Sequence, residues 1–511
     1  MDTLFTSALS SRRKPLRPWP GIREAALLIL VSVAGFSGCA PMNFAGSDDL
    51  ANPEVDEARG QMILFVGTDP ANLRTDLYLA QSTHSGLGGS FTEADGPDLV
   101  EAEAFQIENL TSPLDEAVPT LAAEGLALFA GGAPFPVPDR TGTLIALLAL
   151  GSQDNPSPNE GRVVLMDVDG RNFTEGPTIP GLLSARFTWN GAFLVVEHTD
   201  PEQPTRTRTS LVSTLAPEMG SYPAVEDPEL DVEFAGLERG SNRVLLEVRD
   251  SEGRRDILLL DPDAETSTSL TETIDAAVSD AALSPDGSRI ALTVTDPNSG
   301  TRSVIAYALE DGPEGAYTLG PMSGQECFWP VWQPPREDST QSSLACVCQH
   351  LETERPDIVL WNPDATDSVE TLTAGPQPNV FDGTMTGLTV RSRPQWGPGG
   401  KLLVFGASTR EEALDGEAMT LVTLPLDSSA YPVFTAAEGS SDWAHFSAAS
   451  EEPHLLVWDR GESGLQDSIG RHPIQVVIAD QPEQAPHPVV LGRNLFVAYP
   501  QYLGANTMLY P

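Results

Sequence analysis

Short apolar segments of four or five residues return along this chain at a nearly constant distance. After a first interval of 82 residues, each segment begins 46 to 58 residues after the one before it. A period in this range is typical of chains built from a repeated supersecondary unit. The strongest segments are Met62–Val66, Leu144–Leu148, Phe193–Val196, Val244–Val248, Ile290–Val294, Leu344–Val347, Leu402–Phe405 and Leu455–Trp458.

The stretch from Val278 to Leu309 shows the repeated unit most clearly. Its apolar runs are separated by Ser284-Pro285-Asp286-Gly287 and by Asp296-Pro297-Asn298-Ser299-Gly300. Proline fixes φ, glycine permits positive φ, and Asp and Asn bond to their own backbone, so both breaks predict tight turns. Runs of this length between such turns are typical of consecutive antiparallel strands. Similar runs flank the strongest segment of most other units, which predicts an all-β chain.

The phrase S-P-D-G-S-R-I-A-L at Ser284–Leu292, followed by a turn rich in Asp and by the strand V-I-A-Y, resembles the repeat of TolB-like β-propellers. It is also similar to the repeats of WD-repeat proteins and of the propeller domains of prolyl-oligopeptidase-type enzymes. The resemblance implies a β-propeller of seven or eight four-stranded blades, with the first strand of each blade at the central channel. The chain has no G-x-S-x-G nucleophile elbow, so peptidase activity is not expected from it.

The two ends of the repeated region complement each other. No apolar run before Met62 can serve as the first strand of the first unit, whereas an extra run, Asn494–Pro500, follows the last unit. We expect this C-terminal strand to supply the missing inner strand. Closing a ring in this way removes exposed sheet edges that would otherwise pair with other chains.

The charge of the chain excludes one large class of partner. The formal net charge is −44, with 73 acidic residues against 29 Lys and Arg. Recognition of nucleic acid requires clustered basic side chains that neutralise phosphates. We therefore expect no nucleic-acid partner, and we expect a soluble acidic surface that repels other anions.

The amino terminus has the pattern of an export signal. A basic region that includes Arg12, Arg13 and Lys14 precedes the apolar run Ala25–Ala34, which is too short to span a bilayer and has the length of a secretory core. Gly35-Phe36-Ser37-Gly38-Cys39 then resembles a bacterial lipobox, in which the cysteine is lipidated. Ser11–Leu16 also resembles a twin-arginine motif, so the export route stays open between that route and the general one.

These features predict three parts of the chain. Residues 1–38 form a lipoprotein signal peptide, residues 39–60 an acidic flexible tether, and residues 61–511 the propeller. Several acyl chains on Cys39 would give stable membrane attachment. Because Ala40 and not Asp follows Cys39, we expect the outer membrane of a bacterial cell envelope, with the protein facing the periplasm or the cell surface.

Three cysteines remain after Cys39. An exported protein meets an oxidising compartment, so a disulfide is expected. Cys346 and Cys348 lie two residues apart on one strand, which disfavours a bond between them. Cys327 begins the neighbouring inner strand, so either Cys327–Cys346 or Cys327–Cys348 is expected, with the remaining thiol buried. The spacing lacks the paired C-x-x-C of zinc sites, and no metal or other cofactor is expected.

Polar residues where the chain enters the inner strands are the best candidates for binding a partner. If the propeller resemblance holds, they lie near the central channel, and Arg and Trp are common in binding hot spots. The sequence therefore predicts a non-catalytic scaffold that binds an envelope protein or peptide. The alternative is an envelope enzyme, or a carbohydrate- or metal-binding propeller, with its site in the channel. The candidate binding residues are Arg186, Arg391, Arg393, Asp442, Trp443 and His445.

Overall fold

The structure is a computed structural model, and it describes most of the middle of the chain and shorter segments elsewhere. These segments are almost entirely β-strands, with two 3₁₀ turns, η5 (Pro217–Met219) and η6 (Pro313–Gly315). None of the helices in them is long and apolar enough to cross a membrane. The described residues are 62–68, 75–82, 105–111, 137–138, 144–150, 160–167, 173–319, 325–335, 343–351, 355–365, 369–373, 376–378, 385–396, 400, 402–409, 420–426, 433–434, 444–446, 455–459, 474–478, 487–489, 496–502 and 508–509.

The described strands form eight antiparallel sheets, which we number along the chain. Sheet 1 contains β1 (Met62–Thr68), β2 (Thr75–Ser82), β3 (Phe105–Asn109) and β34 (Phe496–Tyr502). Sheet 2 contains β4 (Val137–Pro138), β5 (Leu144–Leu150), β6 (Glu160–Asp167) and β7 (Phe173–Pro180). Sheet 3 contains β8 (Leu182–Phe187), β9 (Phe193–Thr199), β10 (Thr207–Ser213) and β11 (Ser221–Pro223). Sheet 4 contains β12 (Asp231–Leu237), β13 (Val244–Arg249), β14 (Arg255–Asp261) and β15 (Thr266–Ser269).

The C-terminal half continues the pattern, with extra strands in the last two sheets. Sheet 5 contains β16 (Ala277–Leu283), β17 (Arg289–Thr295), β18 (Arg302–Ala308) and β19 (Tyr317–Leu319). Sheet 6 contains β20 (Gln325–Trp332), β21 (Leu344–His350), β22 (Arg355–Trp361) and β23 (Val369–Thr371). Sheet 7 contains β24 (Pro376–Pro378), β25 (Met385–Val390), β26 (Gln395–Trp396), β27 (Leu402–Thr409), β28 (Thr420–Pro425) and β29 (Val433–Phe434). Sheet 8 contains β30 (Ala444–Phe446), β31 (Leu455–Asp459), β32 (Ile474–Ile478), β33 (His487–Val489) and β35 (Met508–Leu509).

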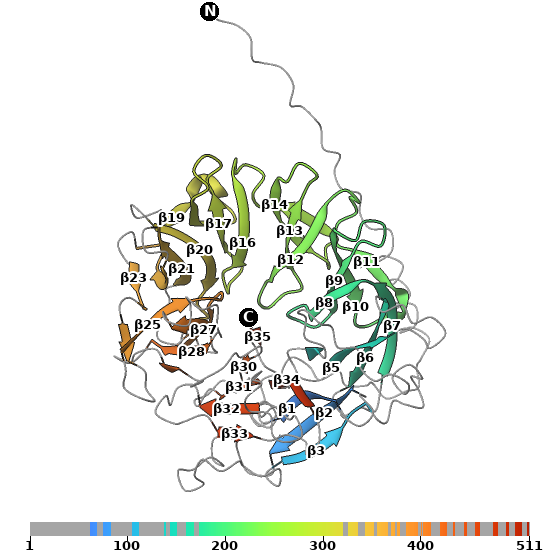
Figure 1. Cartoon of the computed structure of the whole chain (residues 1–511). Coiled ribbons are helices and arrows are strands. Elements are labelled where there is room, and N and C mark those ends of the chain that lie inside the picture. Colours follow the sequence, from blue (N-terminus) through green and yellow to red (C-terminus); the bar gives the residue numbers. More distant parts are fainter. Residues whose placement is uncertain are drawn as a thin grey trace, which may run out of the picture.

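The sheets stand around a common centre, each with one edge turned inward (Figure 1). In sheets 3 to 6, the first strand along the chain is the inner one, and the following strands lie progressively further out. In sheet 1, β34 pairs antiparallel with β1, from Ile63 opposite Tyr502 to Thr68 opposite Phe496. The last strand and the first strand of the chain therefore lie in one sheet.

The core lies between neighbouring sheets. Along β17, Ile290 and Leu292 pack against side chains of sheet 4, whereas Ala291 packs against side chains of sheet 6. All three are fully buried. Successive side chains of a strand point to opposite faces, so a second strand placed between two sheets must be apolar on both. This explains why the second strands are the strongest apolar runs of the sequence.

Sheets 7 and 8 depart from the predicted four-strand unit. The sequence places the first strand of unit 7 at Arg393–Trp396, but the structure divides it into β25 and the two-residue β26, and β24 adds a further strand beside β25. In sheet 8, β35 pairs with β30 as an additional strand. These strands are two to six residues long, too short to produce a distinct apolar pattern. In unit 2, β4 corresponds to the second of the two expected positions for a first strand, Phe135–Val137 rather than Leu126–Phe129.

A polar clamp recurs at the outer side of sheets 1, 4 and 6. In sheet 4, the Thr271 hydroxyl accepts a hydrogen bond from the backbone N–H of Ile257 (2.9 Å) and donates one to the carboxylate of Asp256 (2.6 Å). The same two contacts are made by Thr111 with Leu77 and Asp76, and by Thr373 with Ile358 and Asp357. Each threonine lies two residues beyond the end of the outer strand and satisfies a backbone N–H group of the strand beside it, so the clamp fixes the end of the outer strand in place.

Candidate functional site

The inner strands of sheets 4 to 7 share an irregularity at the same level. In sheets 4, 5 and 6 the register shifts immediately before the last two residue pairs with the second strand. In sheet 7 the inner strand is interrupted at the same level, between β25 and β26, where the backbone N–H of Arg391 still donates a hydrogen bond to the carbonyl of Gly406 (2.8 Å). Such irregularities leave residues without a register partner on the second strand and turn their side chains in a new direction. The residues without a register partner whose side chains are exposed or half-buried are Ala235, Asp280, Trp329, Arg391 and Arg393, which we call the bulge row.

Two residues of the bulge row have unusual backbone conformations. Asp280 has φ 53° and Trp329 has φ 56°, in the left-handed region that favours glycine. Asp tolerates this region better than most residues, but a bulky side chain such as Trp is a clear outlier there. Such conformations persist only where the surroundings enforce them, and they concentrate at functional sites.

The contacts around Trp329 show what enforces its conformation. The Arg302 guanidinium lies 3.7 Å from the ring centre of Phe328 and also binds the carboxylate of Glu326 at 2.7 Å. The Phe328 ring in turn meets the Trp329 ring edge to face, with 4.9 Å between centroids. Glu326 and Phe328, which precede Trp329 on β20, are therefore both held by Arg302 of sheet 5.

The residues that follow Trp329 are held from the other side. Arg393 donates a hydrogen bond to the carbonyl of Pro330 (2.7 Å), and the indole N–H of Trp396 donates one to the carbonyl of Val331 (3.1 Å). The indole N–H of Trp332 reaches back to the carbonyl of Ala282 in sheet 5 (3.1 Å). The bulge of β20 is thus tied to both neighbouring sheets.

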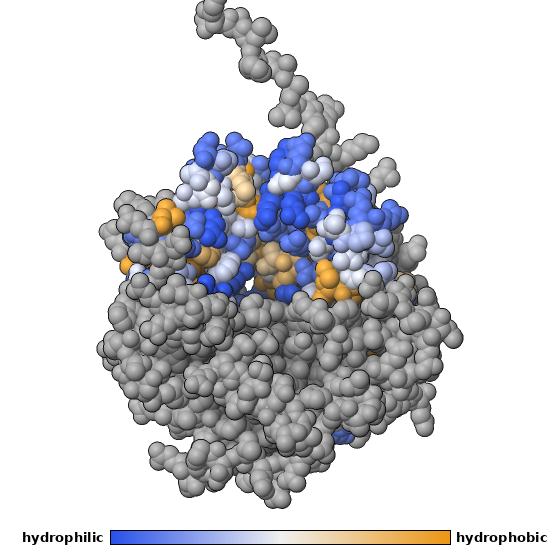
Figure 2. All heavy atoms as spheres, in the orientation of Figure 1, coloured by the Kyte–Doolittle hydropathy of each residue, from blue (hydrophilic) through white to orange (hydrophobic). Residues whose placement is uncertain are grey.

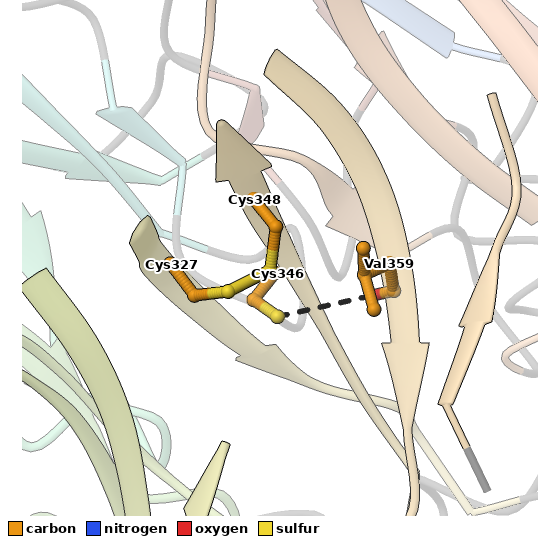
Figure 3. The surroundings of a disulfide bond; sticks show 4 residues. All are labelled: Cys327, Cys346, Cys348 and Val359. Atoms are coloured by element: carbon orange, nitrogen blue, oxygen red, sulfur yellow. Dashed lines mark hydrogen bonds between the residues drawn. A yellow bond between two sulfur atoms is a disulfide. The ribbon is translucent and has the colours of Figure 1, made fainter. Parts of the chain in front are cut away.

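A disulfide links β20 to β21 two residues before Trp329. Cys327 and Cys348, which are direct register partners on β20 and β21, form the bond, and Cys346 is a buried free thiol (Figure 3). The sequence left two pairings open, and the structure contains Cys327–Cys348. Burial raises the pKa of the Cys346 thiol to about 12, and its Sγ lies 3.9 Å from the carbonyl of Val359. A thiol with so high a pKa is almost entirely protonated at neutral pH and therefore unreactive.

Charges of both signs lie in and beside the bulge row. Burial lowers the pKa of Arg393, and the negative charge of Asp280 opposes this effect, which places the two charges near each other. Beside them, Glu233 and Glu247 are direct cross-strand partners on β12 and β13. Burial raises the pKa of Glu247, the Arg255 guanidinium at 2.7 Å opposes the rise, and Glu233 and Asp280 add to it. A guanidinium and a group of carboxylates thus lie near each other in and beside the bulge row.

Arg186 is positioned differently from the other candidate arginines. Its guanidinium lies 4.0 Å from the ring centre of Phe234 in sheet 4 and 3.7 Å from the carboxylate of Glu197. Glu197 also accepts hydrogen bonds from the backbone N–H of Phe234 (2.8 Å) and from the hydroxyl of Ser184. Arg186 therefore joins sheets 3 and 4 at their inner strands, and its role in partner binding stays a prediction.

The structure brings together only some of the residues predicted from the sequence. Arg391 and Arg393 lie in the bulge row, where the Arg391 Nε donates to the hydroxyl of Ser408 (2.9 Å). His445 lies on β30, opposite Val457 on one side and Met508 on the other. Asp442, Trp443 and the predicted lipidation site Cys39 lie outside the described residues. Their roles stay predictions.

Sequence reasoning missed Asp280 and Trp329. Both sit inside apolar first strands, where the pattern suggested ordinary packing. The only signals were a charged residue in the run V-S-D-A-A-L and two aromatic residues beside a proline in F-W-P-V-W. Neither indicates a bulge, because the register shift depends on pairing with the second strand.

The described part of the surface is mostly hydrophilic at the outer rims of the sheets. Apolar side chains are exposed between polar ones both near the centre of the ring and at its outer side (Figure 2). Within the described ranges, no group of three or more His, Cys, Asp or Glu residues is placed to hold a metal ion. The inner strands of sheets 4 to 7 and the bulge row thus contain an aromatic residue, guanidinium groups and carboxylates.

Comparison with known proteins finds similarity only at the level of solved structures. No protein-family model and no curated protein matches the chain. TolB from Acinetobacter baumannii is 13% identical over 75% of this chain and 65% of its own, with a TM-score of 0.33. The β-propeller domain of the Trilobed protease from Pyrococcus furiosus is 8% identical over 72% of this chain and 92% of its own, with a TM-score of 0.38.

A structure of prolyl endopeptidases is 12% identical over 87% of this chain and 60% of its own, with a TM-score of 0.46. The chain thus matches less than two thirds of the length of TolB and of the prolyl endopeptidase. At such identities a likeness concerns the fold alone. The sheets around a common centre agree with it: the chain has a β-propeller fold that resembles those of TolB, peptidase propeller domains and WD-repeat proteins.

Proposed function

We propose that the protein is a non-catalytic scaffold that binds a peptide segment of a partner protein at the bulge row. The observation that carries this proposal is that the inner strands of sheets 4, 5 and 6 have a register shift, and the inner strand of sheet 7 a break, all at one level. Bulges are over-represented beside functional sites, where they redirect side chains. Here the irregularities fall on inner strands and include Asp280, Trp329 and Arg391.

The chemistry of the bulge row suits a peptide. Trp and Arg dominate binding hot spots because they combine a large contact area with directional bonds. Carboxylates beside Asp280 and guanidinium groups at Arg391 and Arg393 fit a chain that carries charges of both signs along its length. Electrostatic complementarity of this kind selects a partner and its register more than it adds affinity.

We propose further that the eight sheets are eight blades of a ring closed by β34. The pairing of β34 with β1 supports closure, because it joins the two ends of the repeated region within one sheet. Truncation of the chain before Asn494 tests this. A closed ring predicts that the truncated protein unfolds at a lower urea concentration and aggregates through the exposed edge of β1.

For its location, we propose a bacterial cell-envelope lipoprotein with residues 1–38 as signal peptide, Cys39 as the lipidated residue, 39–60 as a tether and 61–511 as the propeller. The lipobox-like sequence before Cys39 supports this. Expression of wild-type protein and of Cys39→Ser, followed by membrane fractionation, tests it. Wild-type protein in the outer membrane and soluble Cys39→Ser protein are expected, and soluble wild-type protein would contradict the proposal.

Cross-linking in the native envelope tests the scaffold role. The lipidated protein is mildly cross-linked and purified, beside an Arg391→Ala variant and a control, Arg254→Ala, whose side chain is exposed on the β13–β14 turn. We expect a stoichiometric protein partner with wild type and with the control, and its loss with Arg391→Ala. Turnover of a substrate by purified protein, with no partner, would favour the competing enzyme interpretation.

A further inference from the structure

We propose that Trp329 is the aromatic anchor of the bulge row, that it docks an apolar side chain of the bound peptide, and that the Cys327–Cys348 disulfide positions it. This inference rests on the proposed peptide-binding function. It adds the residue that makes the central contact, the class of side chain that it recognises, and the device that keeps it in place.

The backbone conformation of Trp329 supports a functional role for its side chain. Its φ of 56° is unfavourable for a bulky residue, whereas glycine or asparagine at this position would adopt the same φ at a lower cost. Among the described residues outside glycine, only Glu265 and Asp280 share this conformation. We therefore infer that the aromatic side chain of Trp329 is retained for binding despite its unfavourable backbone conformation, since such conformations are common at ligand clamps.

The surroundings of the ring are the second argument. The Trp329 side chain packs partly against the core between sheets 6 and 7 and remains half-buried. Its neighbours in the bulge row are Ala235 and Asp280 before it and Arg391 and Arg393 after it. A rigid ring with charged residues on the neighbouring inner strands gives a large apolar contact at low entropic cost, which suits an apolar side chain flanked by polar residues.

The disulfide is the third argument, because it fixes the register next to the bulge. Cys327 pairs with Cys348, Phe328 with Val347, and the register then shifts to Val331 opposite Ala345. The covalent bond therefore stands two residues before Trp329, one pair before the last regular pair ahead of the shift. Without it, β20 could slide by one residue on β21, which would turn Trp329 toward the other face.

The test begins with a random peptide library displayed on phage and selected on the full mature chain. Selected peptides are synthesised, and their affinities are measured by fluorescence anisotropy for wild type, Trp329→Ala, Trp329→Gly and Tyr317→Ala. Tyr317 is the matched control, since it is an exposed aromatic residue on the outer strand β19. We expect peptides that share an apolar residue, a loss of affinity of at least about tenfold for both Trp329 variants, and no change for Tyr317→Ala.

The glycine variant separates binding from folding. Glycine relieves the backbone strain, so Trp329→Gly should remain folded by circular dichroism while it loses the peptide. Equal affinities of wild type and both Trp329 variants would overturn the inference and leave the scaffold proposal standing. Selection of no peptide at all would instead overturn the scaffold proposal.

The role of the disulfide is tested with the double variant Cys327→Ser, Cys348→Ser. We expect faster hydrogen exchange at Phe328 and Val331, unchanged exchange in sheets 3 and 4, and a loss of peptide affinity similar to that of Trp329→Gly. Unchanged affinity would overturn the positioning role. If the double variant does not fold, Arg302→Ala, which removes the guanidinium from the Phe328 ring, tests the same point with the same expected loss.

Discussion

The polar clamp of sheet 4 allows a sharp test of how the blades are held together. Replacing Thr271 by valine keeps the shape of the side chain but removes its hydroxyl. The N–H of Ile257, a fully buried residue, then loses its acceptor, and the Asp256 carboxylate loses one donor while it keeps the Ser269 hydroxyl at 2.8 Å.

The expected cost follows from these contacts. A buried N–H without a partner costs about 1–3 kcal/mol, and the lost contact with a charged carboxylate adds to this, so we expect destabilisation of at least about 2 kcal/mol for Thr271→Val. Thr271→Ser keeps the hydroxyl and loses one methyl group, which costs about 0.8 kcal/mol. Thr266→Val is the matched control, because Thr266 is exposed on β15, and it should change stability by less than about 0.5 kcal/mol.

The assay is urea unfolding monitored by circular dichroism, combined with hydrogen exchange at the amide of Ile257. The order wild type, Thr271→Ser, Thr271→Val in decreasing stability is expected, with a faster exchange of Ile257 only in the valine variant. Equal stability of the serine and valine variants would refute the reasoning, because it would mean that the hydroxyl contacts contribute nothing.

Two further predictions concern single side chains. The Cys346 thiol, with a pKa of about 12 and no exposed surface, should not react with a thiol reagent in the folded protein and should react fully in urea; rapid reaction of folded protein would contradict its burial. The backbone N–H groups of Ser299 and Asn298 donate to the Asp296 carboxylate and lower its pKa. The carboxylate therefore adds stability at pH values above its unfolded pKa of about 3.8. This contribution is lost as the pH falls through the lower pKa of the folded state. Asp296→Asn should therefore be less stable than wild type at pH 7 and equal to it at low pH, and a difference that persists in acid would count against this account.

The sequence predicts the positions of most strands but not the register shifts in their pairing. The second strands are apolar on both faces because each lies between two sheets, so runs such as Ile290–Val294 stand out in the sequence. The place of the leftover C-terminal strand beside β1 could be inferred because one unit lacked an inner strand. Turn residues such as Pro285 and Gly287 marked the hairpins, since their backbone preferences are local.

The bulge row could not be inferred in the same way. A register shift arises from the pairing of two strands, and no residue type in V-S-D-A-A-L predicts it. Arg391 and Arg393 could be predicted as candidate binding residues because they are charged and lie near a predicted strand. Trp329 lies within the aromatic run F-W-P-V-W, which predicts ordinary strand packing. The disulfide stayed open between two pairings because Cys346 and Cys348 point to the same face, and only the register of β20 on β21 distinguishes them.

Partner binding at the bulge row is tested most directly by photo-cross-linking from inside the bulge row in the native envelope. Ala235 is small and half-buried on the inner strand of sheet 4, so a photoreactive amino acid can replace it, and Thr266 on the outer strand of the same sheet provides the control position. If a partner binds at the bulge row, we expect one discrete protein adduct from position 235 that is absent at position 266 and lost when Trp329→Gly is added. No adduct at 235, or the same adduct from both positions, would contradict binding of a partner at the centre of the ring.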